Sequence, residues 1–335
     1  MPTTDHITLA HGNGGLHMRR LIDEVFARHL ANPELQTTLD AAPVTLGQGT
    51  PLVTTDGFTV QPLEFPGGSI GTLAVHGTCN DLAVAGADPH YLSLNAFIEE
   101  GLPLDLLDRI VADLAHAATA AGVRVVAGDT KVLRRGEGGG LYLATTGIGS
   151  RNPALVLGME QVQPGDKLLV SGPVGDHGAC VMLAREEFGL RGELVSDAAD
   201  VQGLCRAARE IPGLRFMRDP TRGGLATVGH ELARACQMTV RMSDAAIPVH
   251  DAVQSICEIL GYDPLFLACE ARVAAVAAPE AADTILAAWR ALPDGGNAQL
   301  IGTIDTGPAR LEIETELGGT RILEELRDDP LPRIC

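Results

Sequence analysis

The sequence is poor in aromatic and in basic residues. Phe, Trp and Tyr make up 3% of the 335 residues, and Lys plus Arg total 25 against 43 Asp plus Glu, a formal net charge of −18. Phosphate backbones and anionic membranes attract basic surfaces, and unpaired bases stack on aromatic side chains. The composition therefore argues against a nucleic acid or a membrane surface as the main partner.

The sequence also lacks a long apolar run and a secretory leader. No stretch of about 18 uninterrupted apolar residues occurs, and the start, Met-Pro-Thr-Thr-Asp-His, has no basic n-region or apolar h-region. We therefore expect no membrane span and a cytoplasmic location, where thiols stay reduced.

The seven cysteines include no Cys-x-x-Cys pair, so a structural zinc site is not expected. Cys180, Cys205, Cys236 and Cys257 sit in apolar, helix-like stretches and are interpreted as small buried hydrophobes. Cys335 differs, because it is the last residue and follows Pro-Arg-Ile. A chain end is often frayed and without function, and the local sequence alone leaves that interpretation open.

Neither a P-loop nor the dinucleotide-binding glycine fingerprint is present. Many of the 39 glycines instead form other clusters, among them Gly223-Gly224 at the start of a predicted helix. Glycine lets backbone N–H groups approach a phosphate, and a helix N-terminus adds a favourable dipole. Turns use glycine as well, so each cluster alone is weak evidence.

Acidic residues recur beside glycine or asparagine where predicted elements meet loops, at Asp56, Asp81, Asp129 and Asp219. Magnesium takes a few carboxylates together with waters and phosphate oxygens, and Lys131 follows closely on Asp129. The alternative is that each Asp is a turn or cap residue.

Glu270 lies between apolar residues just before a predicted strand. A carboxylate in such surroundings is a candidate general base. The alternative is an ion pair with Arg272 or with another cation.

Hydrophobic periodicity predicts two mixed α/β halves with a weak boundary over 151–164. The predicted strands are 50–55, 91–98, 123–127, 141–148, 167–171, 238–242, 273–277, 299–304 and 310–314. The predicted helices are 69–85, 103–121, 198–209, 223–235 and 250–260, with one more that ends at 188. The strand 123–127 is expected to present Gly-Asp-Thr-Lys at its C-terminal end, and two prolines in the last eight residues favour an extended tail.

The order of the motifs resembles the HypE family of hydrogenase maturation factors, within the aminoimidazole ribonucleotide synthetase-like (PurM-like) superfamily. The motifs are His11-Gly-Asn-Gly-Gly15, Asp56-Gly57-Phe58, Gly77-Thr-Cys-Asn-Asp-Leu-Ala-Val-Ala-Gly-Ala87, Ile98-Glu-Glu-Gly101, Gly128-Asp-Thr-Lys-Val132, Gly175-Asp-His-Gly178, Asp219-Pro-Thr-Arg-Gly-Gly224 and Pro332-Arg-Ile-Cys335. The Asp and Gly motifs are shared across the superfamily, and the terminal Pro-Arg-Ile-Cys is specific to the family.

The resemblance implies a mixed α/β, two-domain PurM-like fold. Residues 1–155 would form an ATP-binding and dimerisation domain, whose sheet builds a β-barrel with that of a second copy. Residues 156–320 would form a C-terminal α/β domain, and 321–335 a mobile tail.

The resemblance also implies an ATP-dependent carbamoyl dehydratase. The carbamoyltransferase HypF would deliver a carbamoyl group to Cys335, ATP would phosphorylate its oxygen, and loss of phosphate would leave a thiocyanate. The cyanide would then pass to iron on the HypC–HypD complex, as a ligand for [NiFe]-hydrogenase. The alternatives are a related small-molecule kinase or synthetase, such as thiamine-monophosphate kinase, and a maturation scaffold without enzymatic activity.

By this resemblance Cys335 is the carrier thiol, Glu270 the candidate base and Lys131 a candidate for orienting substrate or neutralising phosphate. The residues assigned to Mg²⁺ are Asp56, Asp81 and Asp129. The residues assigned to the nucleotide are Asn80, Thr130, Gly223 and Gly224.

Overall fold

Residues 5–37, 41–186, 189–190, 192–315 and 317–326 are described by the computed structural model. In this part of the chain, contacts divide the fold into one unit of residues 5–82 and 87–151 and a second unit of residues 83–86 and 152–326. The predicted carrier, Cys335, lies outside the described residues.

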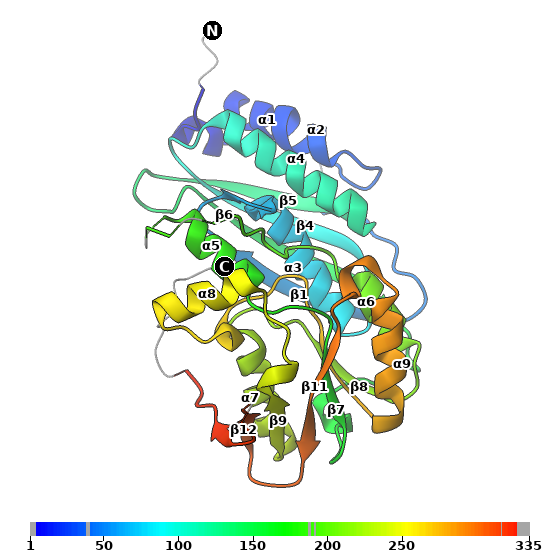
Figure 1. The fold of residues 1–335 in the computed structure, drawn as a ribbon. Coiled ribbons are helices and arrows are strands. Elements are labelled where there is room, and N and C mark those ends of the chain that lie inside the picture. The colour runs from blue at the N-terminus through cyan, green and yellow to red at the C-terminus, as the bar shows by residue number, and fades with distance from the viewer. Residues whose placement is uncertain (1–4, 38–40, 187–188, 191, 316, 327–335) are drawn as a thin grey trace. The chain divides into compact units, whose positions relative to one another are not determined.

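The first unit is built on a four-stranded sheet in the order β1–β6–β4–β5 (Figure 1). β1 with β6 and β6 with β4 are antiparallel pairs, whereas β4 and β5 are parallel. A parallel pair requires a crossover, which α4 provides before it ends at Gly122 in the left-handed conformation. The bounds are β1 (Thr50–Phe58), β4 (Ala87–Glu99), α4 (Leu104–Ala121), β5 (Arg124–Leu133) and β6 (Leu141–Arg151).

The helices that pack on this sheet come from the N-terminal part of the chain, from between β1 and β4, and from α4. The short helical segments before β1 pack against α4, as the adjacent ribbons in Figure 1 show. The bounds are η1 (Leu9–Gly12), α1 (Leu16–Leu21), η2 (Ile22–Ala27), α2 (Arg28–Leu30), β2 (Glu64–Phe65), β3 (Gly68–Ser69) and α3 (Ile70–Val84).

In the described ranges, helices cover one face of the four-stranded sheet. Leu92, Leu94, Ala96 and Ile98 of β4 alternate with more exposed residues and are buried, because side chains on a strand point to opposite faces in turn. Thr145, which pairs with Leu94 across the sheet, donates a hydrogen bond of 2.9 Å to a carbonyl of α3. The face that carries Leu94 and Thr145 is therefore the helix-covered face.

The opposite face is partly exposed in the described ranges: Tyr91 on it is buried and donates to the Thr45 carbonyl, whereas other side chains are exposed. Val53 of β1 is 67% exposed and Phe97 of β4 is 37% exposed. Both side chains are large and apolar, so this face carries apolar surface available for another molecule.

The second unit contains a seven-stranded sheet in the order β13–β12–β9–β11–β7–β10–β8. The strand bounds are β7 (Lys167–Val170), β8 (Leu214–Arg218), β9 (Thr239–Ser243), β10 (Ala274–Ala277), β11 (Gln299–Asp305), β12 (Arg310–Glu314) and β13 (Thr320–Ile322). The helix bounds are η3 (Met159–Gln161), α5 (Asp176–Ala184), α6 (Gln202–Arg209), α7 (Gly224–Cys236), η4 (Asp244–Ala246), α8 (Asp251–Leu260), η5 (Pro264–Phe266), α9 (Pro279–Arg290) and η6 (Pro293–Gly295).

Helices cover both faces of this second sheet. Leu168 and Val170 of β7 belong to one buried cluster with α7, and Leu169 belongs to another with α6 and α9. Trp289 of α9 lies fully buried in the second cluster and donates 2.9 Å to the Leu204 carbonyl of α6. A sheet with both faces covered explains why β10 is apolar and buried along its whole length.

The sequence prediction for 123–127 is wrong in one respect. β5 continues to Leu133, so Gly128-Asp-Thr-Lys131 lies inside the strand and not at its end. The reason is long-range: β5 stays paired with β4 as far as Leu133. The helical segments over 16–30, the strand β8 and the helix α9 were not predicted.

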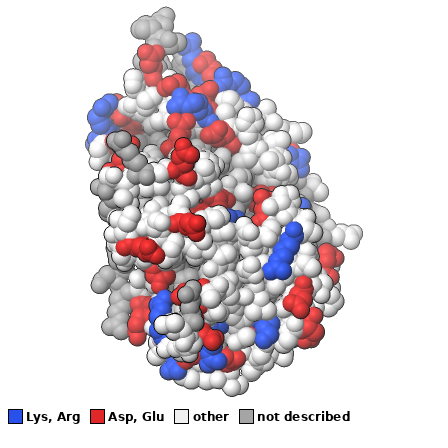
Figure 2. All heavy atoms as spheres, viewed as in Figure 1, with Lys and Arg blue, Asp and Glu red and all other residues white. Residues whose placement is uncertain are grey.

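The surface carries the acidic excess without gathering it in one place on the face seen in Figure 2, where acidic and basic side chains are intermixed. None of the helices in the described ranges is long and apolar enough to cross a membrane.

Gly71 sets how closely α3 approaches α4. A Cβ atom at this position would clash with the main-chain oxygen of Ile110, and overpacking of this kind typically costs about 1–3 kcal/mol. We expect Gly71→Ala to lower the free energy of unfolding by about that amount in urea titrations. Gly203→Ala in α6 is the control, because a Cβ there meets nothing within 4 Å; equal stability of the two variants would contradict this packing.

Candidate functional site

Asp56 and Asp81 lie along the contact between β1 and α3. Asp81 Oδ2 accepts a hydrogen bond of 2.8 Å from Thr54, and Asp56 Oδ1 accepts one of 2.8 Å from the N–H of Gly57. Gly77 lies one helical turn before Asp81, and its missing side chain leaves room for Phe58 and the Asp56 carboxylate. The structure thus brings these two predicted residues to one place, both partly exposed.

Asp129 and Lys131 form a separate pair on β5. Lys131 Nζ lies 2.8 Å from Asp129 Oδ2, and both side chains are more than half exposed, at 62% and 51%. The hydrogen bond from Lys131 lowers the pKa of Asp129, with a further contribution from the N–H of Thr130. The carboxylate is therefore ionised at neutral pH and partly neutralised by its neighbour.

Asp129 faces away from Asp56 and Asp81. Asp56 pairs with Thr145, which lies on the helix-covered face. Asp129 pairs with Asn95, the residue after Leu94. Because Leu94 lies on the helix-covered face and strand residues alternate, Asn95 and Asp129 lie on the opposite face. In the described ranges no group of three His, Cys, Asp or Glu side chains is arranged to hold a metal. The assignment of Mg²⁺ to all three aspartates stays a prediction.

Asp56 and Asp81 on their own have the donor chemistry that Mg²⁺ requires. This ion is usually bound through one or two carboxylates, with waters and phosphate oxygens completing its shell. Two adjacent, partly exposed carboxylates fit that requirement.

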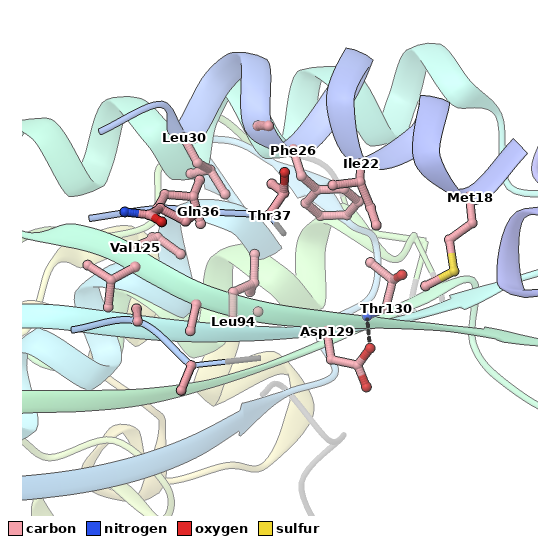
Figure 3. Close-up of a pocket in the computed structure, with 17 residues that line it drawn as sticks. Met18, Ile22, Phe26, Leu30, Gln36, Thr37, Leu94, Val125, Asp129 and Thr130 are labelled. Carbon is pink, nitrogen blue, oxygen red and sulfur yellow. Dashed lines mark hydrogen bonds between the residues drawn. The ribbon is translucent and has the colours of Figure 1, made fainter. Parts of the chain in front are cut away.

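Thr130 points the other way from Asp129, into a pocket of about 160 Å³ between the helices before β1 and the β5 edge (Figure 3). The side chain is 7% exposed, and its Oγ1 has no hydrogen-bond partner in the part of the chain that is described. Met18, Ile22 and Phe26 give the pocket an apolar wall. Asn80, the other polar residue predicted to contact the nucleotide, is buried in α3.

Glu270 is 4% exposed and lies between η5 and β10, in a segment without regular secondary structure. Its N–H donates 3.1 Å to Asp197 Oδ1, and the N–H of Ala271 donates 3.2 Å to Asp197 Oδ2. One buried carboxylate therefore holds two consecutive main-chain groups at the predicted base.

A network of ion pairs surrounds this segment, in which Asp197, Asp176 and Arg272 are largely buried and His250 is half-exposed. The Arg272 guanidinium lies 3.7 Å from Asp197 Oδ2 and 3.4 Å from Asp176 Oδ2, and His250 Nδ1 lies 2.9 Å from Asp176 Oδ1. Burial raises the pKa of Asp176, and the hydrogen bond from His250 opposes that shift. Arg272, the partner proposed for Glu270 in the alternative interpretation, thus contacts two other carboxylates.

Gly223 and Gly224 have left-handed backbone angles, with φ of 74° and 60°. A Cβ on Gly224 would clash with the carbonyls of Leu265 and Leu267. This glycine therefore lets the start of α7 approach the segment that leads to Glu270, and the predicted contact of both glycines with phosphate stays a prediction.

Five cysteines of the described ranges are not activated nucleophiles, because burial raises the thiol pKa of Cys180, Cys205, Cys236, Cys257 and Cys269. Cys180, Cys205 and Cys257 are buried, as predicted. Burial raises the pKa of Cys180 to about 11 and that of Cys257 to about 12, so these thiols are protonated at neutral pH. Cys236 is half-buried and lies 3.3 Å from the Met159 carbonyl.

The histidines in the glycine motifs have structural contacts. His11 Nδ1 accepts a hydrogen bond of 3.0 Å from the N–H of Thr8, the residue that caps the start of η1. His177 Nδ1 lies 2.8 Å from Ser196 Oγ. Asp197 itself was not among the predicted residues, because it lies in a segment without periodicity or glycine clusters.

Both units match one family of proteins. Residues 39–150 match the N-terminal domain and residues 163–313 the C-terminal domain of AIR synthase related protein. The chain is 44% identical over 331 residues to the carbamoyl dehydratase HypE of Azotobacter vinelandii, covering 98% of this chain and 97% of that protein.

Solved structures agree with the sequence relatives. A crystal structure of the hydrogenase maturation protein HypE in complex with ATP superposes with a TM-score of 0.93 at 40% identity, covering 98% of this chain and 99% of the other. A crystal structure of a HypE–HypF complex matches with a TM-score of 0.80 at 38% identity, covering 91% of this chain and 99% of the other.

The fold and the site motifs thus define an AIR synthase related, PurM-like protein of two α/β domains. Within that class, the chain belongs to the HypE family of carbamoyl dehydratases.

His76 of α3 makes stability depend on pH. Burial lowers its pKa to about 4, and its Nδ1 has no hydrogen-bond partner in the described ranges. An unfolded histidine titrates near 6.5, so between that pH and about pH 4 the unfolded chain binds a proton that the folded chain does not. The free energy of unfolding is therefore full above pH 6.5 and decreases as the pH falls towards 4. The shift corresponds to at most about 3 kcal/mol.

We expect His76→Gln to weaken the fall in unfolding free energy between about pH 7 and about pH 4.5. The measurement is a urea titration of both proteins at each pH. An equally steep fall in the variant would mean that another group causes the acid sensitivity.

Proposed function

We propose that this chain uses ATP to convert a carbamoyl group on Cys335 into a thiocyanate, for the cyanide ligand of [NiFe]-hydrogenase. The observation that carries the proposal is the match to carbamoyl dehydratases over 98% of the chain, together with the Pro-Arg-Ile-Cys motif. The solved relative in complex with ATP supports ATP as the co-substrate.

The chemistry requires a better leaving group on the carbamoyl carbon. The amide oxygen attacks the γ-phosphorus of ATP and releases ADP, which leaves an O-phosphorylated S–C(=NH) group after one N–H proton is lost. Loss of the second N–H proton expels inorganic phosphate and forms the carbon–nitrogen triple bond of the thiocyanate. The protein must therefore hold the triphosphate and accept protons.

Asp56 and Asp81 are the residues that would hold Mg²⁺, because their partly exposed carboxylates lie together along β1 and α3. When bound, the ion spreads the negative charge that develops on the phosphoryl oxygens. Lys131 supplies a cation that can neutralise phosphate or orient the carbamoyl group, and Thr130 and Asn80 contact the nucleotide.

Glu270 accepts the N–H protons in this proposal. Its burial keeps water away from the proton transfer, and Asp197 fixes its main chain. A buried acceptor suits a reaction in which two protons leave the same nitrogen.

Cys335 carries the carbamoyl group because a carrier must visit a donor, the active site and an acceptor. The sequence before Cys335 contains Pro330 and Pro332, which do not continue a helix. Burial keeps cysteines such as Cys180 and Cys257 protonated, which supports the tail thiol as the reactive one.

The proposed donor of the carbamoyl group is the carbamoyltransferase HypF, as the HypE–HypF complex of a relative suggests. The proposed acceptor of the cyanide is the HypC–HypD complex with its iron.

Two copies of the chain pair through the partly exposed face of the first sheet in this proposal. Val53 and Phe97 offer apolar surface there, and Asp129 and Lys131 lie on the same face by the strand register. Pairing would bring Asp129 to the contact between copies, where it could serve the nucleotide site of the partner. This arrangement accounts for its separation from Asp56 and Asp81.

The carrier role is tested by the mass of the C-terminal peptide, sampled at successive times after the protein is mixed with HypF, carbamoyl phosphate and Mg·ATP. We expect a carbamoyl adduct on Cys335 that then loses one water, and neither mass in Cys335→Ala. A stable adduct that never loses water would favour a scaffold. An unmodified tail with phosphorylation of a soluble substrate would favour a kinase.

The dimer is tested with Val53→Arg, since an unpaired charge buried in an interface is costly. We expect the variant to sediment as a monomer in analytical ultracentrifugation where the wild type sediments as a dimer. Ile259→Arg on α8 is the matched control, because Ile259 is 66% exposed, close to the 67% of Val53. Dimers of unchanged stability in Val53→Arg would exclude this face.

A further inference from the structure

We propose that Asp197 is a positioning residue that sets the place of Glu270 for proton transfer. The inference rests on the proposed function of Glu270 as the base. It assigns a role to a residue that lies 73 positions earlier in the chain.

The segment around Glu270 has no secondary structure to hold it. η5 ends at Phe266 and β10 begins at Ala274, so the intervening residues lie outside any helix or strand ladder. Neighbouring N–H groups are held by other parts of the unit: Cys269 donates 3.1 Å to the Pro220 carbonyl, and Val273 donates 2.9 Å to Ser171 Oγ. The N–H groups of Glu270 and Ala271 are held by the Asp197 carboxylate.

The geometry requires a carboxylate at position 197. Each of its two oxygens accepts one main-chain N–H, at 3.1 Å and 3.2 Å. A buried charge needs compensation, and the side chain is 2% exposed with the Arg272 guanidinium 3.7 Å away. An amide keeps one acceptor oxygen but turns an NH₂ group towards one of the two N–H donors, which leaves that donor unsatisfied.

Arg272 is itself held in place, so Asp197 rests against a fixed partner. Its Nε donates 2.6 Å to the Pro173 carbonyl, and its Nη1 donates 3.1 Å to the Ala271 carbonyl. Asp176 accepts from Nη2 at 3.4 Å. Asp197 therefore links the fixed guanidinium of Arg272 to the main chain of Glu270.

Loss of this contact should affect the proton transfer more than nucleotide binding. Displacement of a reacting group by about 1 Å can cost roughly 100-fold in rate. We expect Asp197→Asn to lower the single-turnover rate of water loss from the carbamoylated tail by about 10- to 100-fold. The ATP concentration that gives half the maximal rate should change by less than about twofold, because the variant keeps the nucleotide-binding residues.

Asp200→Asn is the matched control. Asp200 lies in the same loop, and its carboxylate accepts 2.8 Å and 3.0 Å from the N–H and Nε2 of Gln202. It supports the start of α6, so its loss reports the general cost of removing a partly buried carboxylate from this loop. Asp197→Glu, which keeps the charge and moves it by one methylene, serves if Asp197→Asn does not fold, with the same split between rate and ATP dependence expected.

The background of Glu270→Gln separates the two claims. If Asp197 acts through Glu270, adding Asp197→Asn to Glu270→Gln produces no further loss of rate. Equal rates in Asp197→Asn and Asp200→Asn, or a further 10-fold loss in the double variant, would overturn the positioning role. Wild-type dehydration by Glu270→Gln alone would overturn the base itself, and with it the inference.

Discussion

One buried carboxylate organises the candidate catalytic segment of the second unit. Asp197 accepts two consecutive main-chain hydrogen bonds from Glu270 and Ala271, and Arg272 compensates its charge. Removing one partner from a buried ion pair leaves an uncompensated charge and is strongly destabilising. Glu270 lies outside regular secondary structure, and this network holds its main chain together with the hydrogen bonds of Cys269 and Val273. Asp176 lies on the other side of Arg272.

The register of the first sheet imposes the second constraint. Because strand residues alternate between faces, Asp56 and Asp129 lie on opposite faces even though their strands share one sheet. A single copy therefore offers two carboxylate positions, one beside α3 and one paired with Lys131. The exposed apolar side chains Val53 and Phe97 are the physical basis of the pairing of two copies proposed above.

Sequence periodicity predicted the elements whose signal is local. The strand β4 and the helix α4 follow from alternation and from an apolar stripe, and the glycine after α4 marks its end. The length of β5 depends on pairing with β4, and Asp197 acts on a residue 73 positions away, so neither has a local signal. The apolar neighbours of Glu270 indicated its burial from the sequence. The face of the sheet on which Asp129 lies could be determined only from the strand register.

In the proposed reaction, the carbamoyl oxygen leaves as part of inorganic phosphate. The most direct test is to carbamoylate Cys335 with an ¹⁸O-labelled carbamoyl group, add Mg·ATP in unlabelled water, and measure the isotope content of the released inorganic phosphate by mass spectrometry. Transfer of the carbamoyl oxygen to phosphorus places one ¹⁸O atom in the phosphate for each thiocyanate formed. Unlabelled phosphate released alongside labelled water would contradict it.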